Sequence, residues 1–193
     1  MRKLTVDDIV DHRAYERERE EFRARIIGVK RRRRVQLGDI VTIVFENTDT
    51  MRFQVQEMAR AERMLTDEQI EHEIATYNQL IPGPGQLSGT LFIEINDKAK
   101  LYEWLPKLVD IQRAVSFWLH DGSQVVSIPE DEERLTREET TTTVHYLKFQ
   151  FTDDQVAAFE QGPVRIVVDH EHYDAVVELT DEQQRELALD LRA

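Results

Sequence analysis

The stretch NTDTMRFQVQEMARAERMLTDEQIEHEIATYNQLIPGPG, residues 47–85, decides how this chain folds, because it places many polar groups on helix faces that should pack inward. Buried carboxylates, amides and guanidinium groups are costly unless they find partners. The stretch therefore predicts either a structural lattice of ion pairs or a functional site.

A helix around Glu57 would place five apolar side chains on one arc, with Glu57 inside the arc and with Arg60 and Glu62 at its borders. The five are Phe53, Met58, Ala61, Met64 and Leu65. A carboxylate that faces apolar packing must bind a cation, a metal or hydrogen-bond donors, or keep its proton. We expect Glu57 to pair with Arg60 or with an arginine of the long basic helix described below. The alternative is an acid–base or metal site.

The next helix, which begins after Thr66, carries an apolar stripe with polar residues beside it. Glu73 and Asn78 flank this stripe, which consists of Ile70, Ile74, Tyr77 and Ile81. The candidate polar cluster of the central stretch is therefore Glu57, Arg60, Glu62, Glu73, Tyr77 and Asn78.

A second candidate cluster lies in VVDHEHYDAVV, where a hairpin concentrates Asp169, His170, His172 and Tyr173. On an extended strand the two histidines would share one face, a spacing compatible with metal binding. A metal site would need a third ligand from elsewhere. A turn built on Asp169 and Asp174 explains the acidic residues equally well.

The composition indicates a globular protein with a heavily charged surface: of 193 residues, 40% are apolar and 33% are charged. The absence of cysteine excludes disulfides, thiolate metal sites, cysteine nucleophiles and cysteine-ligated clusters. The run IVTIVF is far too short to span a bilayer, and the start of the chain lacks the apolar stretch of a secretory signal. We therefore expect a cytoplasmic protein with no membrane contact.

The net charge of −13 is unevenly distributed. Residues 13–34 carry ten basic and four acidic side chains, a net charge of +6, so that the remainder carries −19. The negative remainder would repel a polyanion, so nucleic acid is not the expected partner. The basic segment is expected to meet acidic surface within the molecule or on a second copy, which predicts a homodimer. An RNA-binding module that uses Lys30 to Arg34 is an alternative.

The pattern of apolar residues and turn signals predicts the other elements. After a short turn at Thr5–Asp8, we expect a basic helix over about 12–34, a buried strand at DIVTIVFEN, and a hairpin partner for it around Met51 to Val55. We then expect a strand at 90–95, a helix at 98–108, a hairpin at 115–128, an acidic loop at 129–139, a strand at 140–151 and a helix at 152–160. A hairpin and a helix over about 164–192 close the chain.

Hairpins interspersed with helices predict an α+β fold, in which a mostly antiparallel sheet has helices packed against it. No repeat or low-complexity linker divides the chain, so we expect a single domain over residues 1–193.

Several blocks of the chain together resemble one bacterial family, the domain-of-unknown-function family numbered thirty-five-zero-one. The blocks are LTVDDI, EFRARIIGVKRRRRVQLG, FENTDTMRFQVQEMARAER, YNQLIPGPGQLSGTLFIEI, VHYLKFQF and DHEHY. The resemblance implies no reaction and no catalytic residue. Its genes often lie beside rubrerythrin-like and iron–sulfur oxidoreductase genes, which implies an accessory role in peroxide or iron stress. The DHPxY corner of the family maps onto Asp169, His170 and Tyr173, with Glu171 in place of the proline.

We therefore expect an accessory or assembly protein that forms a homodimer and docks redox protein partners. Whether it is an enzyme stays open, because a metal-dependent or acid–base enzyme could form if Glu62, Glu73, Asn78 or His170 converged on Glu57. No cofactor can be named from the sequence.

Overall fold

The run VTIVFE forms strand β2 (Val41–Glu46), and all six of its residues are buried. Val41, Ile43 and Phe45 face the main apolar core. The opposite face is covered by polar partners: Thr42 donates to Glu94, and Glu46 accepts a hydrogen bond of 2.8 Å from Thr90. Because both faces of β2 are covered, Val44 can interrupt the alternation of apolar residues on the core face with polar residues on the other face.

The computed structural model describes residues 1–130, 136–137 and 140–193. In this part of the chain every strand pair is antiparallel, as predicted from the hairpins. The first sheet has the order β1-β2-β3-β9-β6, with β1 (Arg34–Leu37), β3 (Gln86–Ile93), β9 (Val144–Gln150) and β6 (Ile128–Glu130). The second sheet has the order β11-β10-β4-β5, with β11 (Tyr173–Glu178), β10 (Arg165–His170), β4 (Val115–Trp118) and β5 (Gln124–Val126). The short strands β7 (Thr136–Arg137) and β8 (Thr140–Thr141) pair with each other.

The two sheets enclose one apolar core, to which helices add at both ends. At its centre, the rings of Phe117 and Phe149 meet edge to face with centroids 4.8 Å apart. Helices α6 (Asp153–Gln161) and α7 (Asp181–Leu191) contribute Phe159 and Leu187 to this core. The segment after α4 (Lys98–Trp104) adds Leu108.

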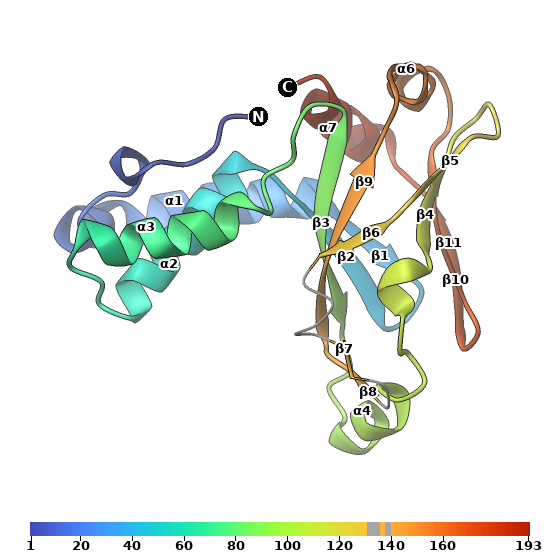
Figure 1. Cartoon of the computed structure of the whole chain (residues 1–193), viewed down its shortest axis with the longest axis horizontal. Helices are drawn as coiled ribbons and strands as arrows, with labels where there is room; N and C mark the ends of the chain where they lie inside the picture. Colours follow the sequence, from blue (N-terminus) through green and yellow to red (C-terminus); the bar gives the residue numbers. More distant parts are fainter. Residues whose placement is uncertain (131–135, 138–139) are drawn as a thin grey trace.

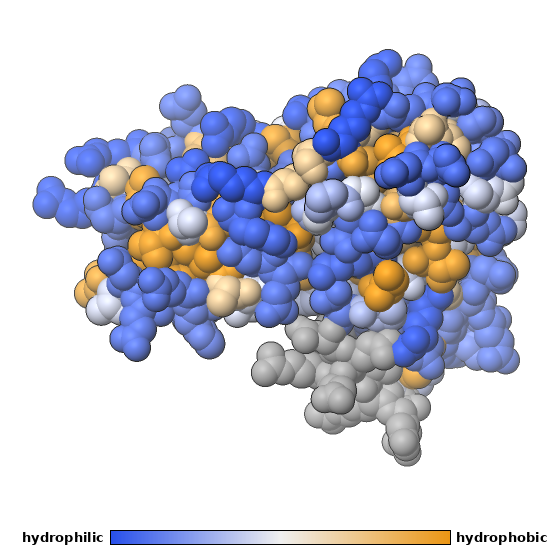
Figure 2. Space-filling view, turned by 45° about the horizontal axis from the view of Figure 1, so that its top comes forward, coloured by the Kyte–Doolittle hydropathy of each residue, from blue (hydrophilic) through white to orange (hydrophobic). Residues whose placement is uncertain are grey.

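The other helices form a separate layer beside the five-stranded sheet (Figure 1). They are the 3-10 turn η1 (Val6–Asp8), α1 (His12–Arg32), α2 (Thr48–Ala61) and α3 (Asp67–Asn78). The 3-10 turn η2 (Ile111–Arg113) comes just before β4 in the chain and is not part of this layer. Tyr146 of β9 packs against the apolar cluster of this layer, which includes Met51, Val55 and Ile74. Apolar side chains reach the surface in patches over both parts of the molecule (Figure 2). No helix among the described residues is long and apolar enough to cross a membrane.

Capping boxes explain where four helices begin. Asn47 caps α2 with Thr50 as its partner, and a Thr-x-x-Gln box precedes each of α3, α6 and α7. In each box the side chain of the capping residue accepts a hydrogen bond from a backbone N–H that the helix leaves free. Such a cap stabilises a helix by roughly 1 kcal/mol, which fixes its start against fraying.

The α+β prediction is confirmed, but several predicted boundaries are wrong. Residues Met51 to Val55 are helical and not a strand, because the box at Asn47 already starts α2 there. The hairpin partner of β2 is β1, which the sequence had assigned to the end of the basic helix. Helix α4 ends at Trp104, and the strand predicted at 140–151 is divided into β8 and β9. In the predicted acidic loop, Pro129 and Glu130 belong to β6, and residues 131–135 and 138–139 lie outside the described residues.

The β1–β2 turn is fastened to the second sheet by Tyr173. The hydroxyl of Tyr173 donates to the carbonyl of Leu37 at 2.5 Å and accepts from the N–H of Ile40 at 3.3 Å. Gly38 has a φ of +70°, and a Cβ atom there would lie 2.4 Å from this hydroxyl. The position therefore requires glycine both for its backbone and for its close approach to Tyr173.

We predict that Gly38→Ala lowers the free energy of unfolding by about 2 to 4 kcal/mol, because it adds a clash with Tyr173 to the cost of a left-handed backbone. Gly122→Ala is the matched control, since Gly122 has a φ of +86° but no atom within 4 Å of the added Cβ. Gly122→Ala should lower the free energy of unfolding only by the cost of the left-handed backbone, about 1 to 2 kcal/mol. Urea unfolding of both variants measures the difference, and equal losses would contradict the clash.

Candidate functional site

Glu57 joins α2 to α1 through three hydrogen bonds. Its Oε1 accepts from the Tyr15 hydroxyl at 2.6 Å and from Arg19 Nε at 2.8 Å, and its Oε2 accepts from Arg19 at 2.8 Å. The Arg19 guanidinium lowers the pKa of Glu57 and thereby keeps the carboxylate charged. Burial and the bond to Glu57 raise the pKa of Tyr15, so that the phenol keeps its proton. Of the pairings expected for Glu57, the structure has the one with an arginine of the basic helix.

The apolar arc expected around Glu57 is wrong in its phase. The buried face of α2 consists of Thr50, Met51, Val55, Gln56 and Ala59. Ala61 and Leu65 are exposed, and Glu57 lies at the edge of the buried face, toward α1. Gln56 lies further inside, where its amide exchanges two hydrogen bonds with the backbone of Val10.

The other members of the first candidate cluster do not converge on Glu57. Arg60 pairs with Glu16 at 2.5 Å, and Glu62 is the exposed C-cap of α2. Burial raises the pKa of Tyr77, which lies on the packed face of α3. Asn78 binds the N-terminal segment, since its amide exchanges hydrogen bonds with the N–H and carbonyl of Leu4. Glu73 is half-buried on α3. Arg60, Tyr77 and Asn78 therefore help to assemble the helical layer.

The second candidate cluster is likewise engaged within the chain. His170 Nε2 lies 2.8 Å from the carbonyl of Val109, and its Nδ1 accepts from the N–H of His172 at 3.2 Å. Both ring nitrogens of His170 therefore have partners, and neither is left to bind a metal. Tyr173 fastens the β1–β2 turn, as described above, and Asp169 and His172 are exposed. Among the described residues no group of three or more metal-ligating side chains occurs.

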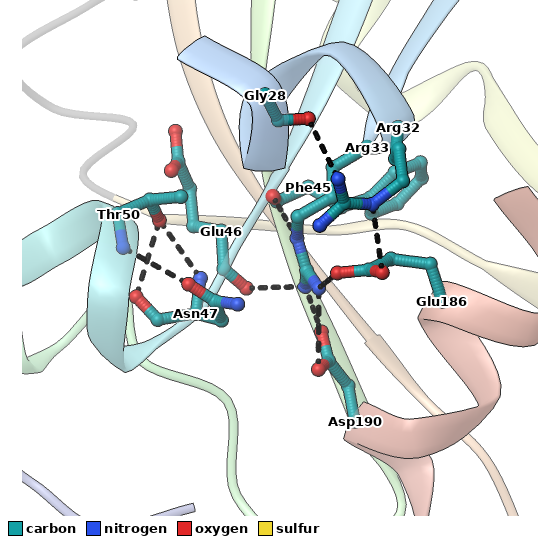
Figure 3. A network of polar contacts seen from close by, with 9 residues as sticks. All are labelled: Gly28, Arg32, Arg33, Phe45, Glu46, Asn47, Thr50, Glu186 and Asp190. Carbon is teal, nitrogen blue, oxygen red and sulfur yellow. Dashed lines mark hydrogen bonds and ion pairs between the residues drawn. The ribbon is translucent and has the colours of Figure 1, made fainter. Parts of the chain in front are cut away.

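The most buried charged network was not identified from the sequence. Arg33, 1% exposed, donates to the backbone carbonyls of Phe45 and Glu46 and to the carboxylates of Glu186 and Asp190 on α7 (Figure 3). Burial lowers the pKa of this guanidinium, and the hydrogen bond that it donates to Glu186 counteracts that effect. The sequence offers five consecutive basic residues from Lys30 to Arg34 and gives no sign of which one turns inward.

An open groove of about 1120 Å³ lies between α6 and α7. Five carboxylates and two arginines line it, which gives it a net negative charge. They are Glu160, Glu178, Asp181, Glu182, Glu186, Arg185 and Arg192. Leu189 adds an apolar side chain that is 66% exposed. Neither Asp181 nor Glu182 has an ion-pair partner among the described residues, so the groove offers free negative charge beside an apolar contact.

Helix α1 presents the opposite chemistry on its exposed face. Ile27 is 53% exposed, with Arg23 one turn before it and Arg31 one turn after it. Neither arginine has an ion-pair partner among the described residues. By contrast, Arg32 pairs with Glu186 and Arg34 pairs with Glu94. With Arg33 buried, three of the five basic residues proposed for RNA binding are already used inside the molecule.

The comparisons with known proteins place the chain in a family. The model of the family described as Protein of unknown function (DUF3501) matches residues 3–191. The chain belongs to this family. The resemblance stated from the sequence blocks is therefore confirmed, and DUF3501 membership carries no assigned reaction.

Solved structures also give no activity to this DUF3501 chain. It is similar to the crystal structure of a novel protein of unknown function from Burkholderia pseudomallei K96243, with a TM-score of 0.91 and 31% sequence identity. The match covers 98% of this chain and 100% of that chain. No curated protein matches the sequence.

We predict that Glu57→Gln destabilises the protein by about 1.5 to 3 kcal/mol at neutral pH, because it weakens charge-assisted hydrogen bonds. Since the folded state lowers the pKa of Glu57, its contribution is complete above the unfolded value of about 4.5 and is lost as the pH falls. The difference in stability between the variant and the native protein should therefore shrink as the pH falls below about 4.5. Unfolding curves between pH 3 and pH 7 test this, and a constant difference would contradict it.

We also predict that Arg33→Met costs about 3 to 5 kcal/mol, because it leaves the buried carboxylate of Asp190 without its strongest partner. Arg34→Met is the matched control at the next residue, where the pair with Glu94 is 43% exposed on each side. It should cost less than about 1 kcal/mol. Chemical denaturation distinguishes the two, and similar losses would show that Arg33 has no special role.

Proposed function

We propose that this protein is a non-catalytic accessory or assembly protein that forms a homodimer through surfaces of opposite charge. The groups that first suggested chemistry support this view, because Glu57, His170 and Tyr173 each bind partners within the chain. The single observation that carries the proposal is the match between the acidic α6–α7 groove and the unpaired basic face of α1.

The match extends to apolar contacts. Ile27 lies between two arginines on α1, and Leu189 lines the same groove as Asp181 and Glu182, about two turns further along α7. A central apolar contact with charged pairs around it is the usual anatomy of a protein interface. Charge complementarity of this kind speeds association and fixes orientation, although exposed pairs contribute little affinity each.

The two surfaces adjoin on one molecule. Arg32, the last residue of α1, binds Glu186 of α7 at 3.2 Å, and Glu186 also lines the groove. A two-fold axis near this junction would place the basic face of each copy on the acidic groove of the other. Such an isologous arrangement closes after two copies, as most homodimers do.

We further propose that the dimer docks redox proteins of peroxide or iron stress. This proposal rests on the family resemblance. The absence of cysteine supports a docking role over electron transfer through a cysteine-ligated cluster. It does not depend on the dimer interface and needs its own test with purified partners.

Sedimentation velocity at increasing NaCl concentration tests the dimer. We predict a dimer at low salt that dissociates as the ionic strength rises, because exposed charge pairs are screened over about 8 to 10 Å near 0.1 M salt. Arg23→Glu with Arg31→Glu should give a monomer, and so should Asp181→Lys with Glu182→Lys. An equimolar mixture of the two double variants should restore the dimer, since each mismatched surface then meets its complement.

Lys98→Glu with Lys100→Glu is the control, because it changes the net charge by the same amount at exposed positions of α4. This variant should remain a dimer. A native protein that is monomeric at all salt concentrations would refute the proposed homodimer, as would a mixture of charge-reversed variants that stays monomeric.

A further inference from the structure

The outer face of the four-stranded sheet carries a strip across all four strands that is apolar except at Ser116. In register, Val176 of β11 lies opposite Val167 of β10, Val167 opposite Ser116 of β4, and Ser116 opposite Val126 of β5. Val176 is 63% exposed and Val126 is 56% exposed. Their neighbours in sequence, Ala175 and Val125, point into the core. The alternation therefore assigns this strip to the solvent side.

Trp118 adds a large aromatic surface to the strip. Its indole N–H donates to the Ser116 hydroxyl at 2.9 Å, which turns the ring along β4 toward the strip. The side chain is 43% exposed, and Val167 is only 6% exposed, although both residues alternate to the outer side. The sheet lies on the side of the molecule away from α1–α3 (Figure 1), and no described helix covers this face. An exposed tryptophan among valines has the composition of an interaction site.

The charges beside the strip are unbalanced. Asp169 and Asp174 lie directly opposite each other on β10 and β11, and both are exposed. Like charges in such a pair destabilise a sheet. Neither carboxylate has an ion-pair partner among the described residues, and the nearby Arg165 is already paired with Glu178 at 3.2 Å. The face therefore has a net charge of −2 at one border of an apolar strip.

We propose that this surface, the Trp118 face, binds a basic segment of a different protein that places lysine or arginine next to small apolar side chains. The Trp118 face consists of Ser116, Trp118, Val126, Val167, Asp169, Asp174 and Val176. The basic side chains would neutralise the opposed aspartates while the apolar ones cover Trp118 and the two exposed valines, Val126 and Val176.

Pairing of this face with the same face of a second copy is disfavoured, because it would join two surfaces that each have a net charge of −2 and whose one cation, Arg165, is held by Glu178. The basic face of α1 in a second copy has the required chemistry, but the proposed homodimer uses it at the α6–α7 groove. A nucleic acid or an anionic membrane would likewise be repelled. The proposal goes beyond the homodimer, because the Trp118 face and the α6–α7 groove share no residue.

The probe is a synthetic eight-residue peptide with lysines in its first half and valines in its second half, added to the full chain at low ionic strength. The control peptide has the same composition with lysine and valine alternating, which in an extended chain puts the two residue types on opposite faces. In ¹⁵N-resolved NMR spectra, the block peptide should shift the indole N–H of Trp118 in a saturable way. The indole of the half-buried Trp104 should not move. The alternating peptide should bind more weakly, since it cannot place cations at the acidic border and valines on the strip at the same time.

Asp169→Asn combined with Asp174→Asn should weaken binding of the block peptide by about tenfold or more, because two charge contacts are lost. The variant should fold at least as stably as the native chain, since it removes a like-charge pair. It should also keep the salt-dependent self-association, which uses other residues. Loss of peptide binding with self-association kept would therefore be distinguishable from failure of the proposed dimer.

Three results would overturn the proposal. One is an unmoved Trp118 indole, and another is equal binding of both peptides. The third is a set of shifts confined to Asp181, Glu182 and their neighbours, which would place the peptide in the α6–α7 groove.

Discussion

One buried cation holds the parts of this protein in their relative positions. Arg33 follows the last turn of α1, donates to the carbonyl groups of the last two residues of β2, and ends between two carboxylates of α7 (Figure 3). A guanidinium removed from water tolerates few arrangements, because every unsatisfied N–H adds to the cost of its burial. Arg33 therefore fixes the helical layer, the five-stranded sheet and the C-terminal helix relative to one another. Shifting any one of them by a residue would leave a charge unpaired.

Local signals in the sequence predicted most of the helices and strands. Contacts between segments that are distant in the sequence could not be predicted. The boxes at Thr66, Thr152 and Thr180 are complete within four residues, so the starts of α3, α6 and α7 could be predicted from the chain alone. The start of α2 was misread because Met51, Phe53 and Val55 alternate like a strand, while the box at Asn47 uses a threonine as its second member. The inward turn of Arg33 depends on the path of the chain through two sheets and a distant helix. No window of sequence contains that information.

The difference between local and long-range information also explains which part of the candidate site the sequence could predict. A polar residue on an apolar arc correctly marked Glu57 as a group that needs partners, and the expected arginine of the basic helix supplies them. The rotation of α2 about its axis decides whether such a residue lines a pocket or contacts another helix. A small error in the predicted start of α2 therefore changes which residues are expected to face inward. Surfaces such as the α6–α7 groove join residues distant in sequence, so they become visible only in the folded chain.

The hydroxyl of Tyr173 has a consequence for how strands could be added to this protein. Strand β1 is an edge of the first sheet and β11 is an edge of the second, and this hydroxyl binds the turn after β1 while belonging to β11. The two edges therefore protect each other, and their backbone groups are a poor template for an incoming chain. Strand addition and edge-to-edge fibre growth are disfavoured along this seam. On this side of the molecule a binding partner is directed to the broad faces of the sheets, where side chains and not backbone amides select it.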